Sequence, residues 1–394
     1  MDERYADELV ASGDLTPDWR PSFLAVPRQR FIPDVIWHEV DDVMRPVRRA
    51  DDPDRWLELA SGKDSLVTQV DDGAPAGPGD SGDLPTSSAS MLSVVAAMLK
   101  HLDVHGGERV CEIGTGTGWN AALLAHRLGA QKVTTIEIDP EVATHARKAL
   151  SDTGFGGVTT ITGDGSLGYP PQAPYDRVIA TVGSKDMPYS WVEQTRPGGR
   201  IVAPSWTLNY YGLLLTLTVR EDGTATGHFV DDASFMMLRD QRAHRSRQVI
   251  SDTDEYEQAT VTETELHPAD VASGRYSRGA VIAIGTRVPD CRSDYFPSRE
   301  PGSKDGTLRL VDHLSGSWAR LRYDHDGDPP YPVCQFGSRR LWDEVEAAHQ
   351  WWVDHGSPTA ERWRCTVTPR GQWVELGGDA RDGVTLGATR SVPP

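Results

Sequence analysis

The feature that most constrains the fold of this chain is a regular alternation of strand and helix patterns between residues 109 and 203. Short runs rich in Val, Ile and Thr predict strands at 109–113, 132–138, 158–161, 177–182 and 201–203. Apolar residues at helical spacing predict helices at 120–128 and 141–150. Strands that alternate with helices of this length form a mainly parallel sheet covered on both faces. We therefore expect an α/β domain of the doubly wound, Rossmann-like type.

The remaining sequence divides where its composition changes, and we expect three parts. Residues 1–85 form an N-terminal helical and loop region that ends in a Gly-, Pro- and Asp-rich mobile loop or connector at 71–83. Residues 86–239 hold a helix from about 90 to 102, the alternating segment and a hairpin arm at 213–219. Residues 240–394 form a C-terminal α+β accessory domain, with a helix at 339–353 and a hairpin turning at Arg370-Gly371.

A glycine-rich turn stands between the first strand and the first helix of the alternation. Gly114, Gly116 and Gly118 alternate with threonines in this turn. Glycine adopts positive φ freely and lets a ligand approach the main chain. A turn at this place lies at the carboxyl edge of the sheet, where α/β proteins bind ligands. The motif by itself has a second explanation, in which it is only a tight turn between a strand and a helix.

Acidic residues near three strand ends indicate which ligand the turn holds. Glu137 ends the second strand, where a carboxylate can accept both ribose hydroxyl protons. Asp164 follows the third strand, where it can bond an adenine amine. Glu112 precedes the turn and would repel a pyrophosphate but suit a cationic sulfonium or its amino group. No Lys-Ser/Thr pair follows the glycines, which excludes a P-loop. The pattern favours S-adenosyl-L-methionine over a dinucleotide.

Several segments together resemble the protein-L-isoaspartate O-methyltransferases. They are Val26–Pro33, Arg109–Leu128, Gly163–Gly165, Ala173–Thr181 and Gln194–Pro204, within a resemblance over about residues 20–205. The resemblance implies a class I methyltransferase sheet that transfers a methyl group to a peptide carboxylate. The cofactor-binding residues that we predict are Glu112, Gly114, Thr115, Gly116, Gly118, Glu137, Asp164, Gly165 and Thr181.

The acceptor side matches the family only in part. The family's segment reads Gln-Thr-Ile-Ser followed by Gln-Pro, and here residues 85–90 read Pro-Thr-Ser-Ser-Ala-Ser. Thr86 and Ser88 are kept, whereas the flanking glutamine and proline are not. We predict Ser88 as the leading catalytic residue and Thr86 as the second. The competing explanation is that they are N-caps of the following helix.

The longer architecture and the tail around Trp342, Trp351 and Trp352 resemble an extended branch of this family. That branch accompanies ribosomal peptide natural products such as graspetides, lanthipeptides and lasso peptides. The resemblance implies esterification of an aspartate in a cyclised precursor peptide, with collapse of the ester to an aspartimide that either persists or hydrolyses to isoaspartate. The alternatives are a repair enzyme for isoaspartyl proteins, a non-catalytic peptide-binding module and a small-molecule methyltransferase.

Composition argues against several classes of partner, metal site and targeting segment. The chain has 40 basic and 58 acidic residues, a net charge of -18 that disfavours nucleic acid as a partner. Its four cysteines lie far apart without zinc-site spacing, and no run is apolar enough for a membrane span or a signal peptide. We expect a cytoplasmic protein without a metal. A basic run of Arg239, Arg242, Arg245 and Arg247 is read first as a solvated linker and second as a dock for an acidic peptide.

Overall fold

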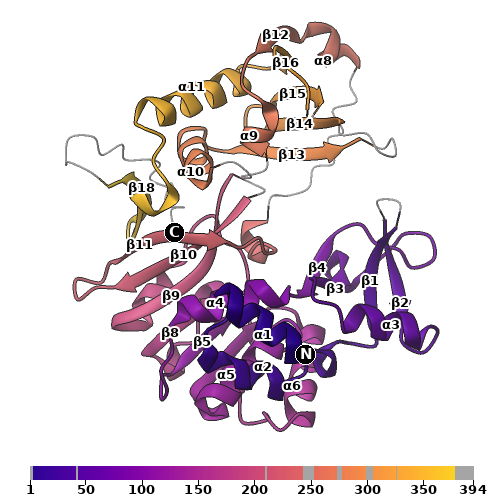
Figure 1. Cartoon of the computed structure of the whole chain (residues 1–394), viewed down its shortest axis with the longest axis vertical. Coiled ribbons are helices and arrows are strands. Elements are labelled where there is room, and N and C mark those ends of the chain that lie inside the picture. The colour runs from indigo at the N-terminus through magenta and orange to yellow at the C-terminus, as the bar shows by residue number, and fades with distance from the viewer. Residues whose placement is uncertain are drawn as a thin grey trace. The chain divides into compact units, whose positions relative to one another are not determined.

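The computed structural model describes residues 3–40, 43–208, 211–242, 253–272, 277–298, 305–324 and 326–377. The chain divides into two compact units. The first contains residues 1–204, 216–225 and 235–240, and the second contains residues 205–215, 226–234 and 241–394. Figure 1 labels the helices and strands of both units.

The N-terminal part of the first unit is a small sheet with short helices, where we had expected helices and loops alone. The sheet has the order β2-β1-β3-β4. Its strands are β1 (Val35–Val40), β2 (Val43–Arg48), β3 (Leu66–Val70) and β4 (Pro85–Ala89), and the helices are α1 (Glu3–Ser12), α2 (Arg20–Ala25) and α3 (Pro53–Ala60). The prediction was wrong here because β1 and β2 bury few residues, so their apolar pattern is weak.

The Gly- and Asp-rich stretch at 71–83 is tied to this sheet by hydrogen bonds. It begins with a short 3₁₀ turn, η3 (Asp71–Gly73). The Asp71 carboxylate accepts the backbone amides of Asp83 and Leu84 over 2.9 and 2.8 Å. The segment is thus a loop, one of the two forms that its composition predicted, and the Asp71 carboxylate holds its two ends together.

The core of the first unit is the predicted parallel sheet. Its order is β9-β8-β5-β6-β7, and all four neighbouring pairs are parallel. The strands are β5 (Val110–Ile113), β6 (Val133–Glu137), β7 (Thr159–Thr162), β8 (Tyr175–Ala180) and β9 (Thr195–Leu208). The helices are α4 (Leu92–Leu102), α5 (Trp119–Leu128), α6 (Pro140–Asp152) and α7 (Tyr189–Glu193). The carboxyl ends of β5, β6 and β7 therefore meet at one edge.

The second unit is an α+β structure, as predicted. One part has the strand order β10-β11-β17-β18, and another is an antiparallel sheet ordered β12-β16-β15-β14-β13. The strands are β10 (Tyr211–Val219), β11 (Ala225–Asp232), β12 (Thr260–Thr264), β13 (Cys291–Pro297), β14 (Asp305–Asp312), β15 (Ser317–Asp324), β16 (Tyr331–Phe336), β17 (Trp363–Thr368) and β18 (Gly371–Leu376). The helices are α8 (Thr253–Gln258), α9 (Pro268–Ala272), α10 (Arg278–Arg287) and α11 (Leu341–Asp354).

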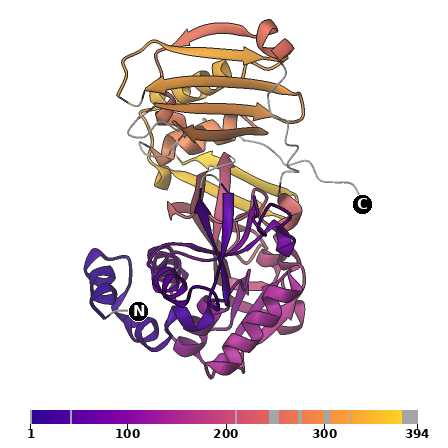
Figure 2. The ribbon, with the colours of Figure 1, turned by 90° about the vertical axis from the view of Figure 1, so that its right-hand side faces the viewer.

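Helices cover one face of this antiparallel sheet, whose strands lie in front of them in Figure 2. Leu341, Trp342 and Val345 of α11 are fully or almost fully buried in the shared core. Trp342 is therefore a core residue, as the sequence favoured. The hairpin turns at Pro369-Arg370, one residue before the predicted position, because Thr368 pairs with Gly371.

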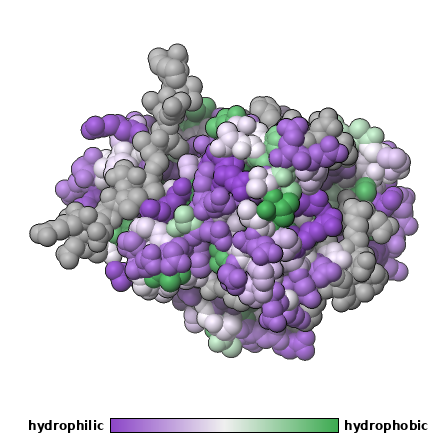
Figure 3. Space-filling view, turned by 90° about the horizontal axis from the view of Figure 1, so that it is seen from above, coloured by the Kyte–Doolittle hydropathy of each residue, from purple (hydrophilic) through white to green (hydrophobic). Residues whose placement is uncertain are grey.

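Three further observations concern the surface, membrane-spanning helices and metal-binding groups of the described residues. The face in Figure 3 is mainly hydrophilic, with apolar residues scattered among polar ones. Across the part of the chain that the structure describes, no helix combines the length and the apolar character needed to cross a bilayer. The same residues contain no group of three or more His, Cys, Asp or Glu side chains that could hold a metal ion.

Candidate donor site at the carboxyl edge of the sheet

The glycine turn has the backbone geometry that the sequence predicted. Gly114, Gly116 and Gly118 have φ angles of +91°, +53° and +86°. A Cβ on Gly114 would lie 2.7 Å from Val182 Cγ1, so this glycine is required by packing. A Cβ on Gly116 would meet only the Ser88 carbonyl oxygen, at 3.6 Å. The turn is thus closed on the Gly114 side and open at Gly116.

Glu112 lies beneath the turn and has no exposed surface. Its two carboxylate oxygens accept hydrogen bonds from Asn120 Nδ2 at 2.7 Å and Thr135 Oγ1 at 2.6 Å. Burial raises the pKa of Glu112 to about 7, although both hydrogen bonds oppose the shift. The carboxylate therefore presents no exposed surface to a ligand, and its role in cofactor binding stays a prediction. Glu112 supports the turn from below.

Thr115 and Thr181 stabilise the turn through hydrogen bonds, one to a side chain and one to the backbone of the turn. Thr115 Oγ1 lies 2.6 Å from Thr135 Oγ1, which extends the hydrogen-bonded chain that starts at Glu112. Thr181, just after β8, donates its hydroxyl to the carbonyl of Gly114 at 2.5 Å. Thr115 is buried and Thr181 is half-buried. Both residues lie at the predicted place, and their recorded bonds support the turn.

Glu137 ends β6 beside the turn, as predicted. Its carboxylate accepts the backbone amide of Gly116 at 2.9 Å and that of Asp139 at 3.1 Å. Burial raises the pKa of Glu137, and these two amides and the charge of Arg239 oppose that shift. Each carboxylate oxygen has accepted one hydrogen bond and keeps a second lone pair for a ligand hydroxyl.

Asp164 and Gly165 follow β7 at the same edge. The backbone amide of Gly163 donates to the carbonyl of Glu137 at 2.8 Å, which places this turn beside the end of β6. Asp164 caps the short turn η5 (Gly165–Leu167) by accepting the amide of Ser166 at 2.8 Å. A Cβ on Gly165 would lie 2.5 Å from Ile113 Cγ2, so this glycine allows the turn to pack against β5. The structure therefore brings the three predicted strand ends together.

The two predicted acceptor residues lie on β4 and differ in their surroundings. Thr86 is 9% exposed, donates to Gln69 Oε1 at 2.9 Å and accepts the amide of Asp72 at 3.1 Å. Ser88 is half-buried, and its hydroxyl makes no hydrogen bond to any other residue that the structure describes. The N-cap explanation is wrong, because α4 has Met91 at its N-cap and no side-chain cap. Of the two hydroxyls, that of Thr86 is therefore used within the fold, and the role of Ser88 as a hydroxyl donor stays a prediction.

Arg28 positions this strand and was not predicted as a site residue. Its guanidinium, 3% exposed, donates to the carbonyls of Gly62, Asp64 and Ala89 at 2.8, 2.8 and 2.9 Å. Burial lowers the pKa of Arg28 to about 10. Ala89 follows Ser88, so the bond to its carbonyl fixes the end of β4. The family resemblance of Val26–Pro33 was the available signal for this segment, but it does not indicate which groups Arg28 contacts.

The basic run at 239–247 is only partly described. Arg239 pairs with Asp72 at 3.0 Å and with Asp139 at 3.3 Å. For Arg239 the solvated-linker interpretation is therefore wrong, because two carboxylates hold its guanidinium. Arg245 and Arg247 lie outside the described residues.

The part of the chain that contains the glycine turn and the three strand ends matches a known protein family. Residues 78–243 match the family model described as protein-L-isoaspartate(D-aspartate) O-methyltransferase. The resemblance to that family is thereby confirmed for residues 78–243.

Curated relatives agree with this match. A protein-L-isoaspartate O-methyltransferase of Methanoculleus marisnigri is 43% identical over 31% of this chain and 56% of its own length. One of Pyrococcus horikoshii is 40% identical over 36% of this chain and 65% of its own length. This chain thus spans less than two thirds of these relatives.

A solved structure is similar over most of the fold. A structure named protein-L-isoaspartate O-methyltransferase covers 95% of this chain and 99% of its own, with a TM-score of 0.53 and 18% identity. At that identity the likeness concerns the fold, which is that of a class I methyltransferase with a β-rich addition.

Proposed function

We propose that this protein is an S-adenosyl-L-methionine-dependent O-methyltransferase that esterifies a carboxylate of a protein or peptide, with isoaspartyl residues as its first acceptors. The observation that carries the proposal is the meeting of the Gly116 turn with the Glu137 carboxylate, 2.9 Å apart, on a segment that matches the isoaspartyl methyltransferases.

The residues present fit the methyl donor. Gly116 leaves space above the turn, and Glu137 keeps lone pairs for the ribose hydroxyls. Asp164 and Gly165 border the same edge and suit the adenine end, while Thr115, Gly114, Gly118 and Thr181 fix the turn. When bound, the donor supplies an electrophilic methyl group on a sulfonium.

Methyl transfer to a carboxylate requires the protein to align the two reactants, and it requires no general base. An aspartate-type carboxyl with a pKa near 3.9 is ionised at neutral pH. One carboxylate oxygen forms a bond to the methyl carbon, the carbon–sulfur bond breaks, and its electron pair stays on sulfur, so no proton moves. A neutral hydroxyl such as that of Ser88 orients the carboxylate without neutralising it. Alignment of this kind contributes about 7–11 kcal/mol in favourable systems.

The finer proposal concerns the acceptor. The departures around Thr86 and Ser88 from the family's acceptor segment, together with the Trp-containing second unit, favour a specialised peptide acceptor. We propose an aspartate in a cyclised ribosomal precursor peptide, with aspartimide as the product of ester collapse. Residues 240–394 would then contribute to peptide binding. Repair of isoaspartyl proteins is the broader function, and the curated relatives favour it.

A methylation assay with three acceptors tests these functions. The purified full chain is incubated with the methyl donor and an isoaspartyl peptide, the matching aspartyl peptide or a cyclised acidic peptide. Mass spectrometry then follows a gain of about 14 Da and the later loss of methanol. Ester on the isoaspartyl peptide supports the repair function, and ester on the cyclised peptide alone supports the finer one. Donor binding without turnover on any peptide would leave a peptide-recognition module.

A further inference from the structure

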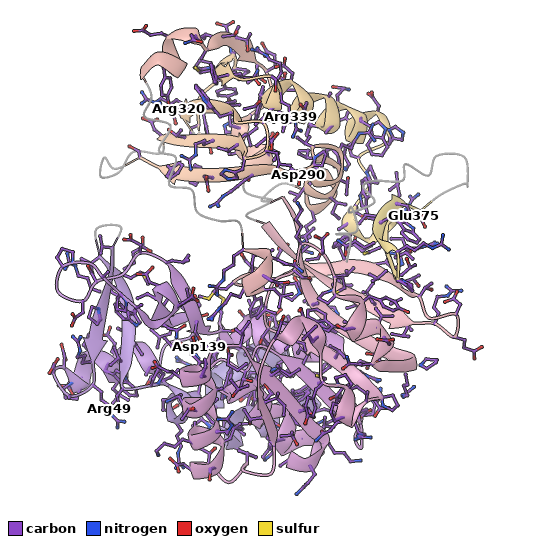
Figure 4. All side chains as sticks on the ribbon, turned by 180° about the vertical axis from the view of Figure 1, so that it is seen from behind. Arg49, Asp139, Asp290, Arg320, Arg339 and Glu375 are labelled. Carbon is purple, nitrogen blue, oxygen red and sulfur yellow. The ribbon has the colours of Figure 1, made fainter. Side chains whose placement is uncertain are left out.

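A ring of polar side chains joins the acceptor strand to the donor site. Thr86 of β4 donates to Gln69 of β3 at 2.9 Å and accepts the amide of Asp72 at 3.1 Å. Arg239 bridges the carboxylate of Asp72 at 3.0 Å and that of Asp139 at 3.3 Å. The Gln69 side chain also lies close enough to Asp139 to lower the pKa of that carboxyl, which completes the ring; Asp139 is labelled in Figure 4.

Asp139 connects this ring directly to Glu137. Its backbone amide donates to the Glu137 carboxylate at 3.1 Å, and its own carboxylate caps α6 by accepting the amides of Glu141 and Val142. Burial raises the pKa of Asp139, but the hydrogen bonds from Val142, Gln69, Arg239 and Glu141 together lower it. Asp139 is thus an ionised, fixed group between the ring and the predicted ribose carboxylate.

The segment that carries Arg239 is itself held in place. The amide of Gly183 donates to the Met236 carbonyl at 2.8 Å, and the amide of Leu238 donates to the Gly183 carbonyl at 2.9 Å. Gly183 follows β8 just after Thr181, which bonds to the glycine turn. Residues 235–240 therefore contact the end of β8, the loop at Asp72 and the start of α6.

Charge explains why an arginine suits this place. Asp72, Asp139 and Glu137 bring three carboxylates to one region, and Arg239 is the cation that pairs with the first two. The side chain of Arg239 is 33% exposed and that of Asp139 only 10%, so the pair is partly shielded from water. Removing the cation leaves a buried carboxylate with less compensation, which weakens the local structure.

We propose that Arg239 is a positioning residue that couples the acceptor strand to the donor site, so that binding of the methyl donor and orientation of the peptide carboxylate depend on each other. This inference rests on the proposed function. Arg239 acts through Asp72 and Thr86 on one side and through Asp139 and Glu137 on the other.

A kinetic comparison of Arg239→Gln, Arg239→Lys and the unaltered chain tests the coupling. Arg239→Gln should raise the KM for the donor and for the isoaspartyl peptide each by roughly tenfold, while Arg239→Lys, which keeps the charge, should recover most of the loss. Arg55→Gln is the control, since Arg55 forms an exposed pair with Glu58 of the same helix. Melting temperatures of all variants identify any global loss of stability.

A double variant distinguishes coupling from two local effects. Thr86→Val breaks the same ring at its other side, so Arg239→Gln with Thr86→Val should weaken donor binding no more than the stronger single change. Additive losses would overturn the coupling, as would an Arg239→Gln chain with unchanged KM for both substrates. If the unaltered chain neither binds the donor nor methylates a peptide, the proposed function fails instead.

Discussion

The backbone amide of Gly116 donates to the Glu137 carboxylate over 2.9 Å, and this bond joins the glycine turn after β5 to the end of β6. It fixes the carboxylate beside Gly116, where an added Cβ would make only an ordinary contact, 3.6 Å from the Ser88 carbonyl oxygen.

Replacing Glu137 by alanine should weaken binding of the methyl donor. The loss should be about 1.5–3 kcal/mol, the usual contribution of hydrogen bonds to a charged group. Equilibrium dialysis with labelled donor measures it. Glu141→Ala, a change at the exposed second residue of α6, serves as the control and should bind normally. Equal affinity in both variants would show that the ribose carboxylate lies elsewhere.

Two glycines of the turn should respond differently to alanine. Gly114→Ala places a Cβ 2.7 Å from Val182 Cγ1 and should lower the melting temperature strongly. Gly116→Ala has 3.6 Å to its nearest neighbour, so its folding cost should be limited to the left-handed backbone, about 1–2 kcal/mol. It should nevertheless lose donor affinity, and Gly116→Val should abolish it. Tight donor binding by Gly116→Val would contradict the site.

Ser88→Ala should lower kcat while the donor affinity stays unchanged. One neutral hydrogen bond contributes about 0.5–1.5 kcal/mol, which corresponds to a roughly three- to tenfold slower turnover. Thr86→Val should instead lower stability, because the Thr86 hydroxyl is used twice within the fold. Single-turnover rates and urea unfolding separate the two effects. A slow, fully stable Thr86→Val together with a normal Ser88→Ala would reverse the assignment.

The pH dependence of the free energy of unfolding should depend on Glu112. Burial raises its pKa from 4.5 to about 7, so the folded state disfavours the ionised form. The protonated Glu112 side chain contributes to the free energy of unfolding in full below pH 4.5. As the pH rises to about 7, this contribution is lost, and the free energy of unfolding falls by on the order of 2–3 kcal/mol. The free energy of unfolding should therefore fall less over that range in Glu112→Gln. Parallel pH dependences of the two proteins would contradict the assignment.

The sequence predicted the strands and the glycine turn that carry the candidate donor site, for a physical reason. Strands such as β5 and β8 are buried on both faces, so their apolar runs are unambiguous, and glycines with positive φ mark the turn that follows β5. The ends of parallel strands then bring Glu137 and Asp164 to one edge without further information.

The strand that carries the predicted acceptor residues was harder to predict, because its conformation depends on contacts between residues that lie far apart in the sequence. The strand β4 is short and polar, and its pairing with β3 decides its conformation. Arg239 appeared as part of a charge run, since its partner Asp139 lies 100 residues away. Arg28 contacts carbonyls of Gly62, Asp64 and Ala89, which no local pattern indicates.

The most direct measurement is a calorimetric titration of the full chain with S-adenosyl-L-homocysteine, the product of methyl transfer. Binding at the carboxyl edge of β5, β6 and β7 predicts saturable heat with one site per chain, which the Gly116→Val change removes. Heat no greater than dilution for the unaltered, folded chain would contradict the methyl-donor site and the function built on it.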